Sequence, residues 1–232
     1  MFAITIVGGR GERLRPLTND RPKCMVLLGG RPILEYQIEW LRDGGATDVI
    51  ISCGYLHEAI REHFGEGERF GMRVTYAVEE QPLGRGGALK LAGEQIPPEA
   101  EIVIATNGDN VVTQPLAPMI GQHERTGAVA TLLLTQLRSP YGIVQQKGRR
   151  IAGFREKPLL PHWLSAGVYV LSRQFFEGLP DVGDHEDALF PRLAAEGRLY
   201  GYRSKAYWKA IDTVKDLREA EEALSERTEL LT

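Results

Sequence analysis

The stretch FAITIVGGRGERLRPLTNDRPKCM, residues 2–25, decides the fold, because a short apolar run passes directly into a glycine-rich, cationic loop. The run 2–7 is too short for a buried helix and is rich in β-branched residues, so it predicts a first strand. Glycines after a strand let the backbone approach a ligand closely, and their N–H groups can point together at an anion. The loop therefore predicts a phosphate site, with a solvated loop of no specific role as the alternative on composition alone.

Two common phosphate-binding motifs do not account for this loop. A dinucleotide fingerprint needs a third glycine at the place where this chain has Leu14. A mononucleotide P-loop is excluded as well, because Lys23 lies between Pro22 and Cys24 and not in a Gly-Lys-Ser or Gly-Lys-Thr run. The cations that remain suit a polyphosphate, and they are Arg10, Arg13, Arg15, Arg21 and Lys23.

The composition of the 232 residues is that of an ordinary globular protein, with 43% apolar and 25% charged residues and a net charge of -3. This length suits one domain with a substantial core, so residues 1–232 are expected to form a single domain. The charge gives no overall attraction to nucleic acid or anionic lipid, so we expect no nucleic acid and no membrane as partners. Two cysteines, no membrane-spanning apolar run and no signal-peptide pattern indicate a cytoplasmic setting.

Short β-branched runs alternate with amphipathic stretches over the first 110 residues. This alternation predicts a mostly parallel sheet with helices on both faces, which is an α/β fold. The later residues are more α+β in character and end in a predicted helix over 213–231, whose apolar stripe could pack on the sheet or against a second copy. That stripe is Leu217, Ala220 and Leu224. The predicted strands are 3–7, 49–52, 74–78, 102–105, 130–137, 141–145, 151–155 and 166–171, and the other predicted helices are 32–43, 57–64, 87–95 and 115–125.

The spacing G-x-G-x-R-L-x-P-L-T-x-x-x-P-K, from Gly9 to Lys23, resembles the signature of the sugar-1-phosphate nucleotidylyltransferases, which make nucleotide sugars. The resemblance continues in family order through EEQPLGRGGALKLA (79–92), NGD (107–109), FREKP (154–158), SAGVYVLS (165–172), EDALFPRL (186–193) and AYWKAIDTVKDL (206–217). It implies a three-layer α/β/α nucleotide-binding fold with a mixed, mostly parallel central sheet and a small sugar-binding lobe. Residues 1–110 would mainly bind nucleotide, and residues 111–232 would mainly bind sugar and supply the C-terminal helix. The chain is expected to be the catalytic core alone, without the C-terminal extensions of some members.

The reaction that this resemblance implies is attack of a sugar-1-phosphate oxygen on the α-phosphorus of an NTP, which releases pyrophosphate and gives an NDP-sugar. A phosphate monoester has a second pKa of about 6, so the nucleophile is already an anion at neutral pH and needs no general base. Catalysis then depends on positioning, cations and metal ions. By resemblance, Asp109 and Asp212 bind Mg²⁺. Arg13 and Lys23 bind the β- and γ-phosphates, and Lys157 holds the sugar phosphate.

The resemblance assigns the remaining contacts residue by residue. The implied catalytic residues are Arg13, Lys23, Asp109, Lys157 and Asp212. The implied nucleotide contacts are Gly8, Gly9, Gly11, Arg13, Lys23, Gln81, Gly86, Gly87 and Asp109. The implied sugar-phosphate contacts are Gly142, Glu156, Lys157, Ser165 and Gly167.

Three places depart from the family pattern. Cys24 stands where a proline usually follows the signature lysine, and Ser165 stands where asparagine is commoner. Lys209 and Ala210 stand where the family often has a more regular Trp-x-Asp-x-Gly pattern, although Asp212 is kept.

The segment EEQPLGRGGALKLA resembles guanylyltransferases acting on mannose- or heptose-1-phosphate, followed by uridylyl or thymidylyl transfer to a hexose-1-phosphate. Two other functions stay open: a non-catalytic regulatory subunit that binds nucleotide sugars, and cytidylyl transfer to a non-sugar phosphate such as phosphocholine. The retained charged residues speak against the first. Glu156 speaks against the second, because a quaternary ammonium group prefers an aromatic cage. A monomer or a homodimer is expected.

Overall fold

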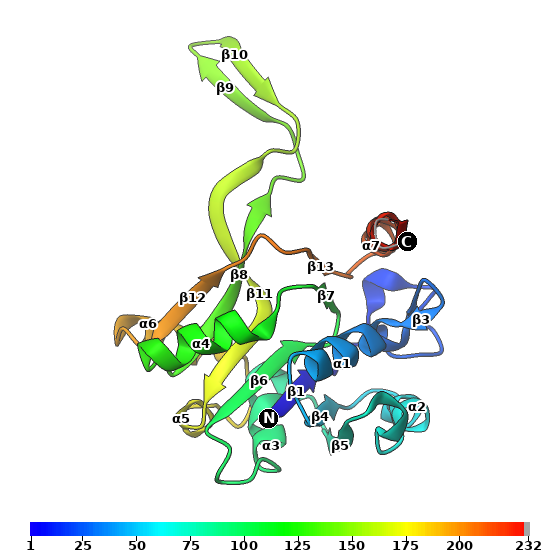
Figure 1. The fold of residues 1–232 in the computed structure, drawn as a ribbon. Coiled ribbons are helices and arrows are strands. Elements are labelled where there is room, and N and C mark those ends of the chain that lie inside the picture. The colour runs from blue at the N-terminus through cyan, green and yellow to red at the C-terminus, as the bar shows by residue number, and fades with distance from the viewer. Residues whose placement is uncertain (230–232) are drawn as a thin grey trace.

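A seven-stranded sheet forms the centre of the computed structural model, which describes residues 1–229 (Figure 1). Its strands are Phe2–Ile6 (β1), Asp48–Cys53 (β4), Arg73–Val78 (β5), Ile102–Asn107 (β6), Ala130–Arg138 (β8), Leu159–Ser172 (β11) and Leu199–Arg203 (β12). They lie in the order β12-β8-β11-β6-β1-β4-β5. β11 is antiparallel to both of its neighbours, and the remaining neighbouring pairs are parallel. The sheet is therefore mixed and mostly parallel, as the resemblance implied.

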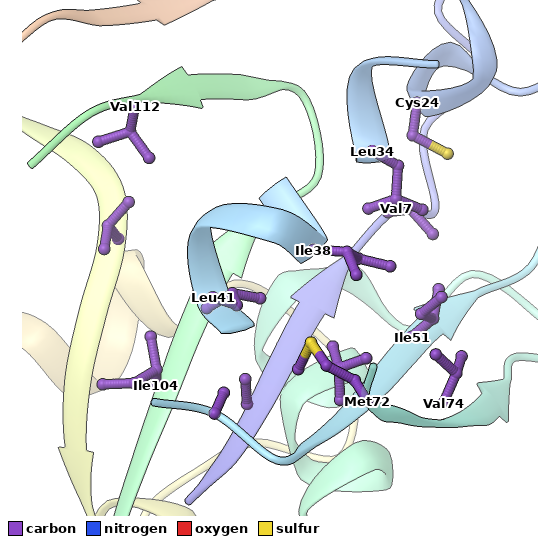
Figure 2. Packing of buried hydrophobic residues seen from close by; sticks show 14 of the residues in the cluster. Val7, Cys24, Leu34, Ile38, Leu41, Ile51, Met72, Val74, Ile104 and Val112 are labelled. Carbon is purple, nitrogen blue, oxygen red and sulfur yellow. The ribbon is translucent and has the colours of Figure 1, made fainter. Parts of the chain in front are cut away.

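Helices cover both faces of this sheet. They are Ile33–Asp43 (α1), His57–Phe64 (α2), Gly84–Gly93 (α3), Leu116–Thr126 (α4), Gln174–Glu177 (α5) and His185–Ala195 (α6). Ile51 of β4 and Ile104 of β6 pack with Ile38 of α1 on one face, as Figure 2 shows. Ile50, the neighbour of Ile51, packs with Leu89 of α3 on the opposite face. Because side chains alternate along a strand, one chain segment supplies both layers of the core, and the result is a three-layer α/β/α arrangement.

The last helix, Val214–Glu229 (α7), packs on short strands and loops outside the central sheet. Leu217 and Ala220 are buried with Leu14, Leu28 and Ile211 in a separate apolar cluster. The stripe predicted from the sequence thus covers the chain's own glycine-rich loop region. Residues 230 and 231 of the predicted helix lie outside the described residues.

Two short ladders border the sheet, and a third projects from it. Leu27–Leu28 (β2) pairs with Arg31–Pro32 (β3), and Asn110–Val112 (β7) pairs antiparallel with Trp208–Ala210 (β13). Ile143–Lys147 (β9) and Arg150–Arg155 (β10) form a hairpin that stands away from the body (Figure 1). We call residues 139–158, which contain this hairpin, the arm, and the rest of the described chain the body.

Most predicted elements are confirmed within two or three residues at their ends. The predicted helix 57–64 matches α2, whereas α3 begins three residues earlier than predicted. The sequence analysis did not predict α6 as a helix or β12 as a strand. Pro191 lies inside α6 and weakens a helical pattern, because a proline removes one backbone donor from the helix interior. No helix among the described residues is long and apolar enough to cross a membrane.

Candidate active site

The glycine-rich loop and Asp109 come together because they follow adjacent parallel strands. β1 and β6 pair in register from Phe2↔Val103 to Ile6↔Asn107, so the segments after them leave the same edge of the sheet. The Gly108 N–H donates to the Ile6 carbonyl at 2.8 Å. A Cβ on Gly108 would lie 2.1 Å from Val7, so only glycine permits this close approach. The carboxyl ends of parallel strands are where open α/β sheets bind ligands.

Asp212 reaches the same place through a second ladder. β7 follows Asp109 directly, and its Asn110 pairs with Ala210 of β13. The Ile211 N–H donates to the Asp109 carbonyl at 2.9 Å. Two aspartates that are far apart in sequence are thereby fixed beside one another by backbone hydrogen bonds.

Lys23 bridges the two carboxylates. Its Nζ lies 2.5 Å from Asp109 Oδ2 and 2.6 Å from Asp212 Oδ1, and Arg13 Nη2 lies 2.9 Å from the same Asp212 oxygen. The Lys23 side chain is 13% exposed, against 28% for Asp109, 34% for Asp212 and 70% for Arg13. Burial alone would lower the pKa of Lys23, but the two carboxylates outweigh it and raise that pKa above its ordinary value. Lys23 is therefore a cation at neutral pH.

The glycine-rich loop is held close to the stem of Lys23. Gly11 has a φ of 63°, and its carbonyl accepts a hydrogen bond from Thr18 Oγ1 at 2.8 Å. A Cβ on Gly11 would lie 2.9 Å from the Thr18 methyl group and 3.0 Å from Lys23 Cβ. By contrast, a Cβ on Gly9 would meet no atom within 4 Å. The absence of a side chain at Gly9 leaves room beside the loop for a ligand.

Two cavities adjoin this loop. The first, of about 320 Å³, contains Arg13, Lys23, Asp109 and Asp212 in its wall. The second, of about 360 Å³, shares Ile6, Gly9 and Asp109 with the first but does not contain Asp212 in its wall. Its other lining residues are Gly8, Glu79, Pro82, Gly84, Arg85, Ala88, Asn107 and Asp184.

The two aspartates fit a hard divalent cation. Their carboxylate oxygens already share one ammonium group, so the site is built to hold positive charge between them. No group of three or more His, Cys, Asp or Glu side chains with metal-binding geometry occurs within residues 1–229. Mg²⁺ characteristically takes one or two protein carboxylates and completes its shell with water and phosphate oxygens. Two carboxylates are therefore a donor set that fits Mg²⁺.

Three nucleotide contacts implied by the resemblance do not line either cavity. Gln81 is exposed in the turn before α3. Gly86 and Gly87 are buried, and their N–H groups donate to the Gly183 carbonyl at 2.8 and 3.3 Å. A Cβ on Gly86 would lie 2.8 Å from that oxygen, so these glycines permit close packing of α3 on the loop before α6. Four other residues of the second cavity were not predicted as contacts from the sequence, although three of them lie in segments that carry the resemblance: Glu79 and Arg85 in 79–92 and Asn107 in 107–109, with Asp184 as the fourth.

The implied sugar-phosphate residues divide between the body and the arm. Gly167 lies in the body with a φ of 67°, and a Cβ there would lie 2.5 Å from the Asn107 side chain. Ser165 is exposed two residues before it. Glu156 and Lys157 are exposed at the base of the arm and line neither cavity. Gly142 packs against Phe154, where a Cβ would come within 2.3 Å of the ring.

The departures from the family pattern have local explanations. Cys24 is 2% exposed in the core under the loop, and burial raises the pKa of its thiol. Lys209 lies 2.7 Å from Asp216 and 2.6 Å from Glu219, so it anchors the first turns of α7. Neither position disturbs the contact of Lys23 with the two aspartates.

Comparison with known proteins identifies the family. The family model described as nucleotidyl transferase matches residues 2–227. The mannose-1-phosphate guanyltransferase of Yarrowia lipolytica is 33% identical over 225 residues, which are 93% of this chain and 62% of that protein. The D-glycero-alpha-D-manno-heptose 1-phosphate guanylyltransferase of Aneurinibacillus thermoaerophilus is 33% identical over 229 residues, which are 97% of this chain and 98% of that protein. The crystal structure of HddC from Yersinia pseudotuberculosis superposes with a TM-score of 0.77 at 26% identity, covering 96% of this chain and 99% of that one. The chain therefore spans about three fifths of some curated relatives and nearly all of others, and it belongs to the nucleotidyl transferase family.

Proposed function

We propose that this protein transfers a guanylyl group from GTP to a sugar-1-phosphate, mannose- or heptose-1-phosphate, and releases pyrophosphate. The observation that carries the proposal is the contact of Asp109, Asp212 and Lys23 beside a glycine loop that leaves space for a ligand. A sugar phosphate is already an anionic nucleophile, so the reaction needs cations and positioning more than a general base. The walls of the two cavities accordingly contain arginine, lysine and aspartate and no histidine among the described residues.

Each charged residue of the first cavity has a role in this proposal. Asp109 and Asp212 would hold Mg²⁺, which would neutralise phosphate charge and polarise the phosphorus that is attacked. Arg13 presents a planar fork suited to the outer phosphates of the triphosphate. Lys23 supplies a point charge next to the same phosphates and to the pyrophosphate as it leaves. Gly8, Gly9 and Gly11 let the backbone approach the nucleotide.

The second cavity supports guanine as the base. Glu79 lies in its wall and accepts a hydrogen bond from the Leu83 N–H at 2.8 Å, which fixes the carboxylate. Guanine carries two adjacent donors, N1–H and the 2-amino group, and a carboxylate can accept both. Uracil and thymine offer one donor on that edge. Because guanine can donate twice to this partly buried carboxylate and uracil or thymine only once, Glu79 favours guanine. It replaces Gln81, Gly86 and Gly87 as the base contact that we propose.

The similarity to guanylyltransferases agrees with this base and suggests the sugars. In the proposed division, residues 1–110 mainly bind nucleotide and residues 111–232 mainly bind sugar. Glu156, Lys157 and Gly142 on the arm, with Ser165 and Gly167 in β11, would contact the sugar phosphate. The two cysteines are free and buried, which fits a reducing cytoplasm. A monomer or homodimer stays our prediction, and sedimentation would measure it.

A product assay tests the proposal. Four NTPs crossed with mannose-, heptose- and glucose-1-phosphate should give pyrophosphate release only with Mg²⁺ and fastest with GTP. ITP, which lacks the 2-amino group, should be a poorer substrate than GTP by about 10-fold or more. Glu79→Gln should remove most of that preference. Tight binding of a nucleotide sugar with no turnover would support a regulatory subunit instead, and turnover with phosphocholine would support the cytidylyl alternative.

A further inference from the structure

A charged cluster lies beside the second cavity, outside the pair of aspartates. Arg85 is in the first turn of α3, and its Nη2 lies 2.9 Å from Asp184 Oδ2. Its Nη1 lies 2.8 Å from Glu186 Oε1, in the first turn of α6. Asp184 also accepts a hydrogen bond from the Arg85 backbone N–H at 2.8 Å. One guanidinium group is therefore clamped by two carboxylates that come from a segment about a hundred residues away.

Backbone contacts make this cluster rigid. The Gly183 N–H donates to the Leu83 carbonyl at 2.7 Å, and the Gly86 N–H donates back to Gly183 at 2.8 Å. A Cβ on Gly84 would also lie 2.8 Å from Gly183. The starts of α3 and α6 are thus locked against each other. The Arg85 head is held in one place before any ligand binds, so it can discriminate between ligands without an ordering cost.

The polar groups around the cluster are suited to hydroxyl groups. Arg85 has five N–H donors, and the two ion pairs leave some of them for a ligand on the cavity side. Asn107 Oδ1, in the wall of the cavity, is buried and finds no hydrogen-bond donor in the described part of the chain. A hydroxyl both accepts from a guanidinium and donates to a carboxylate or amide oxygen. A polyol would satisfy groups of both kinds.

The surroundings indicate which part of the substrates reaches the cluster. Two carboxylates oppose one guanidinium, so the cluster repels a phosphate group and suits a neutral ligand. The buried Tyr169 packs edge-on against His185, the residue before Glu186, with ring centroids 5.4 Å apart, and it belongs to the same strand as Ser165, where the sugar phosphate is proposed to bind. Asn107, in the same wall, touches Gly167. Arg85 and Asp184 line the same cavity as Asn107, so Asn107 links the cluster to the proposed sugar contact at Gly167.

We propose that Arg85, held by Asp184 and Glu186, is a specificity-determining residue that hydrogen-bonds hydroxyl groups of the sugar in the sugar-1-phosphate. This inference rests on the proposed function and adds to it the residue that selects the sugar. Arg85 does not read the base and does not bind the phosphates. Loss of the Arg85 side chain lowers the affinity for the sugar-1-phosphate and leaves the affinity for GTP unchanged.

Steady-state kinetics with both substrates varied tests this assignment. Arg85→Ala should raise the KM for the sugar-1-phosphate by about 10- to 100-fold, the range for a charge-assisted hydrogen bond, and leave the KM for GTP nearly unchanged. Lys90→Ala is the matched control, because Lys90 pairs with Asp181 at 2.5 Å between the same two segments but lines neither cavity. It should leave both KM values nearly unchanged. An equal rise in the KM for GTP, or no change in either KM, would overturn the proposal.

Deoxy sugars give a sharper result. A set of sugar-1-phosphates that each lack one hydroxyl should contain at least one for which Arg85→Ala causes no further loss, because the contact is already missing. Equal losses for every deoxy sugar would mean that Arg85 acts on the fold, and thermal unfolding of the variant would show it. If no sugar-1-phosphate is turned over by the wild type, the proposed function fails, and that result is distinct from failure of the Arg85 assignment. Arg85→Lys, which keeps the charge but loses the fork, should retain only part of the selectivity.

Discussion

The charged side chains at the ends of β1 and β6 already contact one another, whereas those of the arm do not. In the body, Lys23, Asp109 and Asp212 come from three distant segments and already touch, with distances of 2.5 and 2.6 Å. In the arm, Glu156 and Lys157 are exposed, and neither side chain forms a hydrogen bond or ion pair within residues 1–229. The body site is assembled before substrates arrive, whereas the arm residues have yet to find their partners.

This difference decides whether a side chain contributes free energy to folding, to substrate binding or to the transition state. Preassembled charges act on the transition state at no ordering cost, but they interact strongly with one another in the free protein. Exposed groups contribute nothing to folding, and each loses about 0.5–1.5 kcal/mol of side-chain freedom when a ligand binds. Substitutions among the preassembled charges should therefore alter the chemistry, and the stability as well where a carboxylate loses the cation it shares, whereas substitutions in the arm should alter substrate affinity alone.

The largest effect is expected at the aspartates. Asp109→Asn should lower kcat by about 10³-fold, because it removes half of the carboxylate pair that positions a cation against the phosphates. The free energy of unfolding should change by less than about 1 kcal/mol, since Lys23 keeps its contact with Asp212. Pyrophosphate release and urea unfolding measure the two quantities.

Asp216→Asn is the matched control for this change. Asp216 accepts hydrogen bonds from the Thr213 N–H at 2.9 Å and from its hydroxyl at 2.7 Å, and it pairs with Lys209 at the start of α7. Its loss should cost about 1 kcal/mol of stability and leave kcat nearly unchanged. An Asp109 variant that behaves like the Asp216 variant would remove the functional meaning of the aspartate pair.

The second effect concerns Lys23, which joins the two carboxylates. Lys23→Met should lower kcat by about 10²-fold and destabilise the fold by about 1–3 kcal/mol, because Asp109 and Asp212 then lose the ammonium group between them and only Asp212 keeps a cation, Arg13. Mg²⁺ should restore the lost stability, and the Tm of the variant should rise more steeply with Mg²⁺ than that of the wild type. The wild type responds less because its ammonium group competes with the metal for the same oxygens.

Lys209→Met controls for the loss of a half-buried lysine. Lys209 pairs with Asp216 and Glu219, which lie outside both cavities. The Lys209→Met variant should be less stable than the wild type, and its Tm should rise with Mg²⁺ no more steeply than that of the wild type. If the Lys23 variant shows no greater rise in Tm with Mg²⁺ than the wild type, the two aspartates do not form a metal site.

The sequence predicted the body better than it predicted the contacts inside the site. The short β-branched run 49–52 and the amphipathic stretch 57–64 are local properties of the sequence, and both form the expected elements. That Asp109 and Asp212 belong to one site came from the resemblance. The ladder of β7 with β13 that brings them together pairs segments of three residues each, too short to leave a pattern.

The glycines of the segment 79–92 show a second limit. The resemblance implied that Gly86 and Gly87 contact the nucleotide. Glycine allows a close approach, but the sequence does not say to which group. Here the approach is to the Gly183 carbonyl of the loop before α6, a partner almost a hundred residues away. Glu79 and Arg85 lie in the same segment. They differ from Gly86 and Gly87 in that they line the second cavity. Periodicity predicts which residues are buried, and the long-range packing decides which of them face a ligand.

The third effect tests the arm. Lys157→Ala should raise the KM for the sugar-1-phosphate by about 10-fold, because it removes one charge-assisted contact, and should leave the KM for GTP unchanged. The free energy of unfolding should stay within about 0.5 kcal/mol, because the side chain is exposed and unbonded. Lys147→Ala, an exposed lysine of β9, is the control and should leave both KM values unchanged. A clear loss of stability in the Lys157 variant would contradict the contrast between body and arm.

The smallest effect on activity is expected from a substitution of His185. This buried histidine of the body is compared with His162, an exposed histidine near the arm. His185 is fully buried against Tyr169 and Phe190, and neither ring nitrogen finds a hydrogen-bond partner within residues 1–229. Burial, followed by the nearby Arg85 charge, lowers the pKa of His185 from 6.5 to about 4. At neutral pH the ring is uncharged in both folded and unfolded chains, so His185→Leu should not change kcat there.

At acid pH, His185 differs in protonation between the folded and the unfolded chain. Between its unfolded pKa of 6.5 and its folded pKa of about 4, the unfolded chain binds a proton that the folded chain excludes, so stability falls as the pH is lowered through that window. The slope from His185 is at most about 1.4 kcal/mol per pH unit. His185→Leu should flatten the pH dependence of urea unfolding by that amount, whereas His162→Gln, which replaces an exposed histidine of β11, should leave it unchanged. Parallel pH profiles for the wild type and the His185 variant would mean that His185 takes up its proton within the folded body.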